Sequence, residues 1–550
     1  MQVQHMAFMK IYSFLFLLLP ISLFAQKNYD VVVYGATPAG ITAAIQVAKM
    51  GKTVALLEPS KHLGGIMTSG LGGTDVDNHQ EYQNSPGVGG LALEFYRRIA
   101  AAYGNSAEFE AMLKNRTKKT MLWRFEPHVG EEVVKKWVSE HPIAIFYGSR
   151  LSERKNAVPK TGAQIQQIQL ENGQIYRARV FIDATLEGDL LHAAGVKTAI
   201  GREANAVYNE TKNGIRAVTE HAQFLVKVDP YKTPGDPKSG VVPTVQDEPL
   251  GTPGAGDNRL QAYCFRMCLT KNPENRIPFR QPAGYDRSQY ELYLRYEKAG
   301  GKLYAPKADI PNGKTDLGAW HDLSHNLYGM NVAYPGGNYQ TRQRVFDQHK
   351  TFTQGLFYFL ANDPEVSERT RMIWREWGLC KDEFTDNDGW PREFYVRDAR
   401  RMVSDYVITE HDVRRNNPRP VADPVAVAFW PPDLHSIRRI VKDGFASNEG
   451  SVFGEIDWRP FGISYRALVP KTAECTNLLT ASCPSSSHLA YGAIRIEFTF
   501  MAMGQACGTA AVLAIDAKQT VQSVPYKALQ ERLLADHQLI DAGKTEPATK

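Results

Sequence analysis

Between Tyr29 and Glu58 the spacing of apolar residues changes twice. The run YDVVVY is continuously apolar after its first two residues, AGITAAIQVAKM carries apolar residues at helical spacing, and Gly51 separates it from the apolar run TVALLE. This pattern predicts a strand, a helix and a second strand in succession. Such a unit is typical of a doubly wound, Rossmann-type α/β fold with a parallel sheet.

Two later parts of the chain also predict strands of this sheet. Residues alternate between apolar and polar on both sides of Asn172-Gly173, which indicates a hairpin, and the second arm ends in the buried strand RVFIDA. Near the C-terminus, ALVPK and TNLLTAS predict further strands. A long helix of apolar and small residues follows over residues 493–515.

The middle of the chain has a different texture, with Pro, Gly, Trp and Tyr at irregular spacing. It contains a predicted helix in RSQYELYLRYEKAG and another over residues 394–412. We interpret residues 201–450 as an inserted α+β substrate or cap domain. It would divide a first part of the sheet domain, residues 26–200, from a second part with the C-terminal helix, residues 451–550.

The N-terminus carries a targeting signal. Lys10 precedes IYSFLFLLLPISLFAQ, an apolar run too short to cross a bilayer comfortably, and small Ala25 closes it. We predict a bacterial Sec-type signal peptide over residues 1–25, a periplasmic or secreted protein, and no stable membrane span after its removal. An anchor that is never cleaved is the alternative.

Charge and cysteine content exclude some functions. The net charge is only +5 over 550 residues and no run of five basic residues occurs, so we expect no nucleic-acid partner. The six cysteines include no CxxC, which does not support an iron–sulfur cluster. A single bridge, such as Cys475 to Cys483, stays open, and no metal site is expected.

The first strand and helix carry a dinucleotide fingerprint with one departure. Gly35 and Gly40 occupy the first and third glycine positions, while Thr37 replaces the middle one. Amides at the helix N-terminus can hold a pyrophosphate, and a carboxylate after the second strand can accept the ribose hydroxyls. Thr37 would be tolerated if its hydroxyl points at the phosphate; a tight turn without nucleotide is the alternative. The expected cofactor contacts here are Gly35, Thr37, Pro38, Ala39, Gly40 and Glu58.

Three further motifs extend this site. The glycines of HLGGIMTSGLGGTD suggest backbone packed directly against a flat ligand. The strand in FIDATLEGDLLHAAGV delivers polar residues to the carboxyl end of the sheet, where open α/β sheets bind ligands. The late helix carries Gly504 and Gly508 for close packing, and its N-terminus could stabilise negative charge on a cofactor ring. These motifs add Gly64, Gly65, Thr68, Asp183, Thr185, Gly188, Asp189 and Gly492 to the expected cofactor contacts.

Together with FYVRDARRMVSDYVITE, PPDLHSIRR and SYRALVPK, the four motifs carry a family resemblance. The chain resembles the glutathione-reductase-like FAD-dependent oxidoreductases, and more closely a bacterial group related to the flavoprotein part of heterodisulfide reductase. The resemblance covers residues 30–514 and implies an FAD domain split by an inserted substrate domain. The cysteines that hold iron–sulfur clusters in heterodisulfide reductases are missing here, so no cluster is carried over.

The resemblance implies FAD as cofactor, and we expect it to be held without a covalent bond. His62, beside the glycine-rich segment, is an alternative point of covalent attachment. No second dinucleotide fingerprint occurs in the middle domain, which argues against tight NAD(P)H binding. The electron acceptor is unknown; a quinone, another protein or oxygen would serve.

Hydride transfer to a flavin also needs a proton donor or acceptor and often a cation for the substrate. His435 and His488 are the candidates for the proton, and Arg397 and Arg401, four apart on the helix predicted over residues 394–412, for the substrate. Buried core histidines and ion pairs with Asp398 or Asp405 are the alternatives. We expect a small polar substrate, such as a sugar, a sugar acid or another hydroxy or amino compound. A secreted polysaccharide lyase and a non-catalytic flavin-binding protein are the alternative functions.

Overall fold

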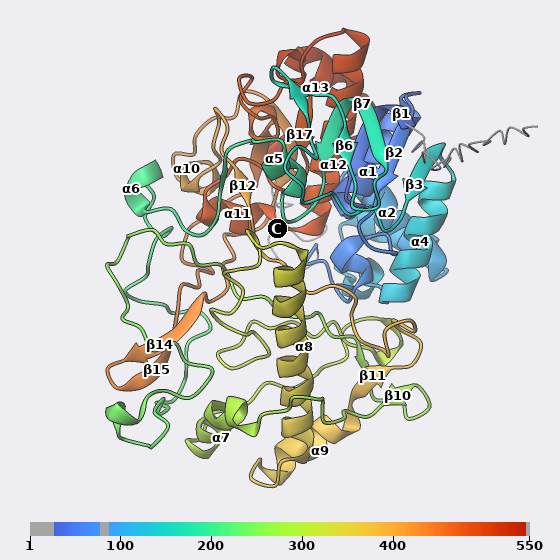
Figure 1. Ribbon diagram of the computed structural model, residues 1–550. Helices are drawn as coiled ribbons and strands as arrows, with labels where there is room; N and C mark the ends of the chain where they lie inside the picture. The colour runs from blue at the N-terminus through green and yellow to red at the C-terminus, as the bar shows by residue number, and fades with distance from the viewer. Residues whose placement is uncertain (1–26, 77–86, 546–550) are drawn as a thin grey trace, which may run out of the picture.

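The computed structural model describes residues 27–76 and 87–545 (Figure 1). The predicted signal peptide lies outside the described residues. A parallel sheet of order β17-β7-β1-β2-β3 forms the centre of one half of the molecule, and all four of these pairings are parallel. Its strands are β1 (Lys27–Tyr34), β2 (Val54–Leu57), β3 (Ile143–Phe146), β7 (Ile175–Asp183) and β17 (Leu478–Thr480). The predicted parallel α/β fold is confirmed.

Side chains of β1 alternate between the two faces of the sheet, as strand geometry requires. Val31 and Val33 belong to a core shared with α1 (Pro38–Lys49) and α12 (Glu497–Asp516). Val32 and Tyr34 belong to a second core on the opposite face. The sheet is therefore buried on both faces, which explains why its strands are almost continuously apolar.

Helices α1 and α12 pack closely against each other. The Thr42 hydroxyl donates a 2.7 Å hydrogen bond to the carbonyl oxygen of Met501. A Cβ atom at Gly504 would lie 2.1 Å from the carbonyl oxygen of Ala39. This confirms the close packing expected of the late glycines. The single helix predicted over residues 493–515 is interrupted, however, and consists of α11 (His488–Ile494) and α12.

Helix α12 is the one helix of the described residues that is long and apolar enough to cross a membrane, judged by length and composition alone. In the structure 89% of its most apolar window is buried. This is the environment of a core helix, consistent with its packing against α1.

Two of the remaining local predictions near the sheet have different outcomes. The hairpin is confirmed, because β6 (Ile168–Gln169) pairs antiparallel with β7 across the Asn172-Gly173 turn. The strand predicted in ALVPK is wrong. Its first residue ends a 3₁₀ turn over Tyr465–Ala467, which the Ser464 hydroxyl caps, and the rest is irregular.

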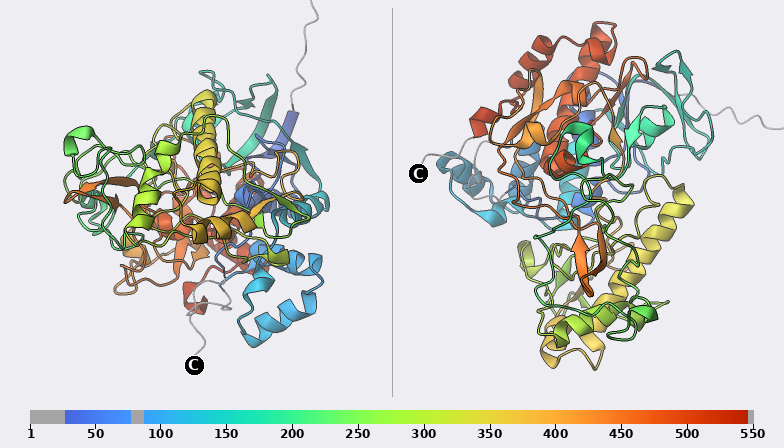
Figure 2. Two further views of the ribbon diagram at one scale, coloured as in Figure 1. Left: turned by 90° about the horizontal axis from the view of Figure 1, so that it is seen from below. Right: turned by 90° about the vertical axis from the view of Figure 1, so that its left-hand side faces the viewer.

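The other half of the molecule has its own core, built from residues between 228 and 446. Figure 1 and the right-hand view of Figure 2 show it below the sheet, with α8 (Tyr339–Asn362) running down through it from an upper end near the sheet. Its other elements are α7 (Glu291–Lys298), α9 (Glu368–Glu376), the sheet β10 (Arg276–Ile277), β11 (Gly378–Cys380) and β9 (Leu269–Thr270), and the hairpin β14 (Arg438–Lys442) and β15 (Phe445–Glu449). We call this half the cap.

The end of the predicted insertion is divided between the two halves: some of its residues pack in the cap, and others pack in the sheet half. Strand β13 (Pro424–Ala428) pairs with β16 (Phe461–Ser464), and both pack in the core of α1 and α12. The domain boundaries themselves stay predictions.

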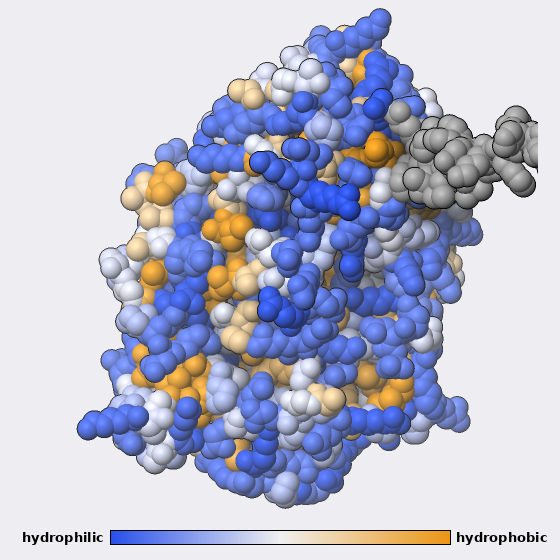
Figure 3. All heavy atoms as spheres, viewed as in Figure 1, coloured by the Kyte–Doolittle hydropathy of each residue, from blue (hydrophilic) through white to orange (hydrophobic). Residues whose placement is uncertain are grey.

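Figure 3 shows a mainly hydrophilic face with apolar residues in separate patches. The remaining elements are α2 (Gly90–Ala102), α3 (Ser106–Asn115), α4 (Pro127–Ser139), α5 (Asp189–Ala193), α6 (Asn205–Tyr208), α10 (Glu410–Val413), α13 (Tyr526–Ala535), β4 (Lys160–Thr161), β5 (Gln164–Ile165), β8 (Thr198–Ala199) and β12 (Arg401–Met402).

The helix predicted over residues 394–412 is wrong. Residues 394–402 are extended and buried throughout; the Tyr395 amide donates to the Cys264 carbonyl oxygen, and β12 pairs with β8. Only α10 at the end of the segment is helical. If this segment were helical, its charged side chains would lie on several buried faces. In the extended chain each charged side chain faces a separate partner. Arg397 and Arg401 consequently do not share a helical face.

Candidate functional site

A cavity of about 490 Å³ lies where the carboxyl ends of β1, β2 and β7 face the cap. On the cap side, α8 contributes Arg342 and the loop before it contributes Tyr334. The predicted site residues that line the cavity are Gly35, Thr37, Glu58, Gly65, Thr185 and Asp189. The structure thus brings three of the four sequence motifs to one cavity.

The turn between β1 and α1 needs both of its glycines. Gly35 has a φ of 96°, which favours glycine, and a Cβ atom at Gly40 would lie 1.9 Å from the Gly35 carbonyl oxygen. Pro38 and Ala39 form the buried first turn of α1 and do not line the cavity. The glycines of the fingerprint therefore have two roles: they let α1 pack closely against the end of β1, and they form part of the cavity wall.

Thr37 does not direct its hydroxyl into the cavity as expected. The hydroxyl donates a 2.6 Å hydrogen bond to the Ala184 carbonyl oxygen and accepts a long one, 3.4 Å, from the Gly40 amide. It acts as the N-cap of α1 and joins the turn to the end of β7. The residue is tolerated at this position because it satisfies backbone groups of the protein.

Glu58 lies at the end of β2, where a ribose-binding carboxylate is expected. Its Oε2 atom accepts from the Ala36 amide at 2.8 Å and its Oε1 atom from the Ser60 amide at 2.6 Å. Burial raises the pKa of this carboxyl above its usual value. Each carboxylate oxygen can accept more than one hydrogen bond, so the group can also bind hydroxyls presented from the cavity.

The glycine-rich segment after Glu58 packs mainly against the protein itself. Cβ atoms at Gly70 and Gly72 would lie 1.9 and 2.0 Å from the carbonyl oxygens of Arg266 and Phe125. The expectation that these glycines face a flat ligand is therefore wrong for Gly70 and Gly72. Gly65 does line the cavity. Gly64 has a φ of 102°, and the Thr68 hydroxyl donates to the Leu63 carbonyl oxygen at 2.7 Å; neither lines the cavity.

At the end of β7, Asp183 organises the backbone. Its carboxylate accepts from the amides of Thr185 and Leu191 at 3.0 and 2.9 Å and from the Thr185 hydroxyl at 2.7 Å. Burial raises its pKa to about 6. Gly188, with a φ of 67°, begins α5 and packs against Arg400. Asp183 and Gly188 therefore shape the turn from behind the cavity.

Asp189 connects the sheet edge to the cap. Its carboxylate accepts from Arg342 of α8 at 2.6 Å and from Arg400 at 3.0 Å. These two guanidinium groups outweigh burial and lower the pKa of the carboxyl. The pair fixes the upper end of α8 against the cavity, which the sequence could not show because residues 189 and 342 are so far apart.

Two further carboxylates line the cavity that were not among the expected site residues: Glu187 in the loop after β7, and Glu393 from the cap. The Tyr334 hydroxyl donates to Glu187 Oε1 at 3.0 Å, and burial raises the pKa of Glu187. Burial and the neighbouring Glu58 and Glu187 raise the pKa of Glu393 to about 8. Both residues line the cavity, together with Arg342 and Arg392. The only sequence signal for Glu187 was its place inside the motif after β7.

His488 lies at the N-terminus of α11, and its side chain is fully buried. Its Nδ1 atom lies 3.0 Å from Oδ2 of Asp398, which is also fully buried. Despite this short distance, neither ring nitrogen and neither oxygen of the Asp398 carboxylate makes a hydrogen bond of acceptable geometry within the described residues. Neither residue lines the cavity described above. A buried imidazole that faces a carboxylate and has unsatisfied nitrogens is a candidate for exchanging a proton with a ligand.

Arg401 lies in the same region but is held by the protein. It donates to Glu203 Oε1 and to the Gly201 carbonyl oxygen, both at 2.7 Å. The ion-pair alternative therefore applies to Arg401, with Glu203 as the partner instead of Asp398 or Asp405. Its charge also raises the acidity of Glu203, whose pKa falls to about 2.

Arg397 is buried, and the half-buried His435 lies close enough to feel its charge. Arg397 donates to Asn326 Oδ1 at 2.9 Å and to the Ala319 carbonyl oxygen at 3.1 Å, so neutral oxygens hold it. Burial and the positive charges of Arg397 and Arg495 hold the pKa of His435 well below its usual range. Asp433 does not orient His435, because its nearest oxygen lies 3.8 Å from Nε2.

Gly492 packs against the segment that contains His435. A Cβ atom there would lie 2.8 Å from a side-chain carbon of Leu434. Gly492 is thus a packing residue of α11 that does not line the cavity.

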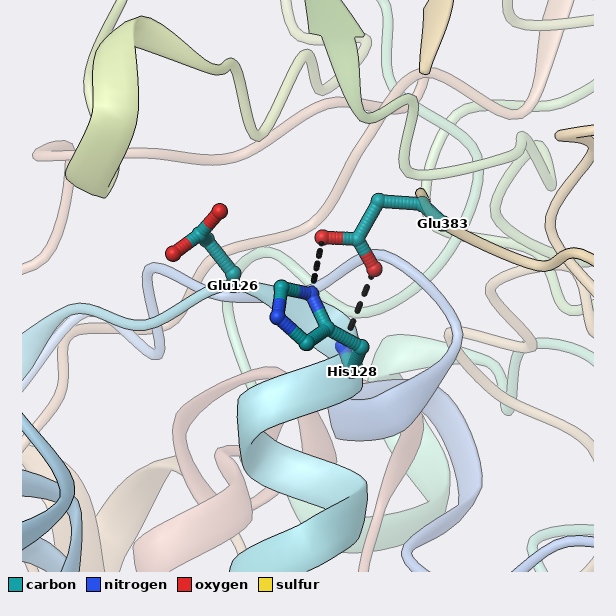
Figure 4. Close-up of side chains that lie close together, drawn as sticks. All are labelled: Glu126, His128 and Glu383. Carbon is teal, nitrogen blue, oxygen red and sulfur yellow. Dashed lines mark hydrogen bonds and ion pairs between the residues drawn. The ribbon is translucent and has the colours of Figure 1, made fainter. Parts of the chain in front are cut away.

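A cluster of Glu126, His128 and Glu383 has the composition of a metal site (Figure 4). The Lys314 ammonium group, however, lies 2.7 Å from Glu126 Oε1 and 2.8 Å from Glu383 Oε1. It supplies the positive charge that a metal ion would bring. The hydrogen bond that the His128 ring donates to Glu383 also raises the pKa of His128. We therefore interpret the cluster as an ion-pair network.

One family of known proteins matches nearly the whole chain. The sequence profile of the family described as FAD dependent oxidoreductase matches residues 30–533. Soluble pyridine nucleotide transhydrogenases of Chromohalobacter salexigens and Mycobacterium bovis are 52% and 49% identical over 44 and 41 residues. These matches cover 8% of this chain and 10% and 9% of the two relatives, so the chain spans about a tenth of their length.

Solved structures give partial matches. L-proline dehydrogenase from P. horikoshii is 15% identical, with 33% of this chain and 59% of that chain covered and a TM-score of 0.24. Thioredoxin reductase from T. acidophilum is 17% identical, with 33% and 40% covered and a TM-score of 0.17.

A parallel sheet with a glycine turn, a helix N-terminus and a buried glutamate at its carboxyl end defines a dinucleotide-binding enzyme of the Rossmann type. The chain belongs to the FAD-dependent oxidoreductase family, and FAD is its cofactor. The residues fit the dinucleotide end of FAD. A Cβ atom at Gly65 would lie 3.5 Å from Cα of Thr37 and would narrow the cavity beside the helix N-terminus.

Proposed function

We propose that this chain is an exported oxidoreductase that moves a hydride between a small polar substrate and FAD. The observation that carries this proposal is the buried pair of His488 and Asp398: Nδ1 and Oδ2 lie 3.0 Å apart, and neither the ring nitrogens nor the carboxylate oxygens make a hydrogen bond within the described residues. A hydride transfer from a hydroxy or amino compound releases a proton, and a positioned imidazole can take it. FAD supplies the two-electron acceptor when it is bound.

In this proposal the residues of the pair have different tasks. His488 Nε2 accepts or returns the proton, and Asp398 faces Nδ1 on the other side of the ring, 3.0 Å away. Arg401 adds positive charge nearby while Glu203 holds it in place. His435 is the second candidate for the proton, because its lowered pKa keeps the ring neutral. Arg397 holds the surrounding loop carbonyls.

We propose that FAD is bound without a covalent link. The cavity residues Gly35, Thr37, Glu58, Gly65 and Thr185 would hold its nucleotide end, with the amides of the α1 N-terminus near the pyrophosphate. His62 is engaged on both sides, with Nδ1 2.9 Å from Glu131 and Nε2 2.9 Å from Asp386. This arrangement supports a structural role for His62.

The direct test is spectroscopic. The purified protein should show the visible absorption of bound FAD, and denaturation should release all of it. Anaerobic titration with a panel of sugars, sugar acids and amino acids should bleach the flavin with one class of compound. Glu58→Gln should lower FAD retention, whereas His488→Gln should keep the FAD and lose bleaching.

Other results would favour the alternative functions. An unsaturated, ultraviolet-absorbing product formed from an acidic polysaccharide with no change in the flavin spectrum would indicate a lyase. A flavin that no compound of the panel bleaches would indicate a binding protein without turnover. A quinone, a protein and oxygen should then be compared as the acceptor that reoxidises the flavin.

Location is a separate part of the proposal. The apolar N-terminal run supports export to the periplasm or the medium, with no stable membrane span after cleavage and no nucleic-acid partner. Fractionation of cells that express the full chain tests it. Mature protein that begins after Ala25 in the periplasmic or extracellular fraction is expected; full-length protein in the cytoplasm would contradict it.

A further inference from the structure

We propose that Cys268 and Cys380 form a disulfide bond that closes the cap when the chain folds in an oxidising compartment. The Sγ atoms of these two residues lie 3.9 Å apart in the cap sheet. The inference depends on the proposed export, because such bonds persist in the periplasm or outside the cell and rarely in the cytoplasm. No sequence motif points to this pair, which 111 intervening residues separate.

The strand register brings the two cysteines together. Leu269 of β9 lies opposite Leu379 of β11, and Thr270 lies opposite Gly378 in the same antiparallel pairing. The next position of this register places Cys268 opposite Cys380. Residues directly opposite in antiparallel strands have Cα atoms about 4.5 or 5.5 Å apart, and both distances fall in the range that disulfides span.

The surroundings favour a structural bond over a reactive thiol pair. Both side chains are buried, at 1% exposure for Cys268 and 0% for Cys380, and they pack with Ile310 and Phe384 in a small apolar cluster. Burial also raises the pKa of the Cys268 thiol, so the thiol resists ionisation once folded. The bond would therefore form before the cap closes, while the thiols are still accessible.

The Cys268–Cys380 bond would form by thiol–disulfide exchange. The oxidant is a thiol–disulfide oxidoreductase of the oxidising compartment, which carries its own disulfide. One cysteine thiolate attacks that disulfide, the second displaces it from the mixed disulfide, and the Cys268–Cys380 bond forms. Two electrons and the two thiol protons pass to the oxidant, which leaves as a dithiol.

The bond would stabilise the wall of the cofactor cavity. From β11 the chain runs through Phe384 to Asp386, Arg392 and Glu393, which line the cavity. Joining β11 to β9 anchors the start of this segment in the cap core. The other cysteines offer no comparable pair: Cys483, for example, contacts the Thr185 carbonyl oxygen through its Sγ atom.

The test is a disulfide map of the FAD-loaded protein. The full chain is isolated from the periplasmic or extracellular fraction, alkylated under denaturing conditions and digested without reductant. We expect one cross-linked peptide containing Cys268 and Cys380 and four alkylated cysteines. Six alkylated cysteines, or a different pairing in the exported protein, would overturn the proposal.

Refolding separates this proposal from that of export. Reduced protein refolded with FAD in a mixture of oxidised and reduced glutathione should form the same bond wherever the chain resides in the cell. The bond should raise the midpoint of thermal unfolding by several degrees relative to reduced protein. Cys380→Ser should abolish this difference, whereas Cys507→Ser, at another buried thiol, should retain it. If the bond forms in refolding but the chain stays cytoplasmic, export alone is contradicted.

Discussion

The Thr37 hydroxyl donates a 2.6 Å hydrogen bond to the Ala184 carbonyl oxygen, which joins the start of α1 to the end of β7. Both segments border the cofactor cavity, so one side chain couples the two motifs that form its wall. The same hydroxyl caps α1 by accepting from the Gly40 amide. A residue that looks like a departure from the glycine fingerprint thus has a structural role in this chain.

Thr37→Val should destabilise the protein. Valine has a similar shape but cannot cap the helix or satisfy the Ala184 carbonyl, and we expect a loss of about 1–3 kcal/mol in the free energy of unfolding. Thr37→Ser, which keeps the hydroxyl, should lose much less. Urea unfolding of the FAD-free protein measures both. If Thr37→Val instead weakened FAD binding without changing this stability, the hydroxyl would have to serve the cofactor and not the fold.

Asp398→Asn should lower turnover while leaving FAD bound. The substitution keeps the size of the side chain but removes the negative charge that lies 3.0 Å from His488 Nδ1. We expect a fall in kcat of about 10²- to 10⁴-fold and an altered pH profile of kcat. Stopped-flow measurement of flavin reduction gives the rate, and the visible spectrum gives the FAD content.

A matched control separates catalysis from burial. His349 is a buried histidine of α8 whose ring bonds to the Val345 carbonyl oxygen and which does not itself line the cavity. His349→Gln should cost stability and leave flavin reduction unchanged below the unfolding temperature. Equal losses of rate in Asp398→Asn and His349→Gln would mean that the His488 and Asp398 pair is only structural.

Gly504→Ala should disturb the contact between α1 and α12. The added Cβ would lie 2.1 Å from the Ala39 carbonyl oxygen, which belongs to helix backbone and cannot turn away. We expect a loss of about 1–3 kcal/mol, or more if the helices cannot separate. At Gly336 the same substitution meets nothing within 4 Å, so Gly336→Ala should leave the thermal midpoint nearly unchanged. Equal midpoints for the two variants would show that the helices are less tightly packed.

Secondary structure could be predicted from the sequence where the local pattern of residues determines it. It could not be predicted where contacts with distant residues determine it. The β1, α1 and β2 unit was predictable because helix and strand periodicities follow each other directly and Gly51 separates them. Residues 394–402 have helix-like spacing, but they are buried on all sides and pair with β8 and Cys264. No local pattern encodes those partners.

The residues of the candidate site could likewise be predicted where a local pattern marks them and not where distant segments bring them together. Gly35, Glu58 and Thr185 were found because each follows a strand that ends at the cavity. Arg342 and Glu393 were missed because they reach the cavity from the cap: Arg342 lies near the start of α8, where no motif marks it, and Glu393 lies in an irregular segment without a periodic signal. The partnership of His488 with Asp398 was missed for a similar reason, since it depended on the extended course of residues 394–402.

The buried carboxyl of Glu497 should make the stability of the protein depend on pH. Glu497, the first residue of α12, is 2% exposed, and burial, together with the charge of Asp75, raises its pKa to about 8 from 4.5. Between these two values the folded protein holds a proton that the unfolded chain releases. The free energy of unfolding should therefore fall as the pH rises from 5 to 8.

Glu497→Gln should reduce this dependence on pH. Glutamine resembles the protonated carboxyl and has no proton to lose, so the variant should match the wild type near pH 4.5 and exceed its stability at pH 8 by about 4 kcal/mol. Some slope should remain, because Asp183, Glu210 and Glu393 also have raised pKa values, of about 6, 7 and 8. Urea unfolding at pH 5 and pH 8 measures the difference, with Glu132→Gln on the exposed side of α4 as the control. Identical slopes for wild type and Glu497→Gln would show that this carboxyl is already ionised in the folded protein at pH 5.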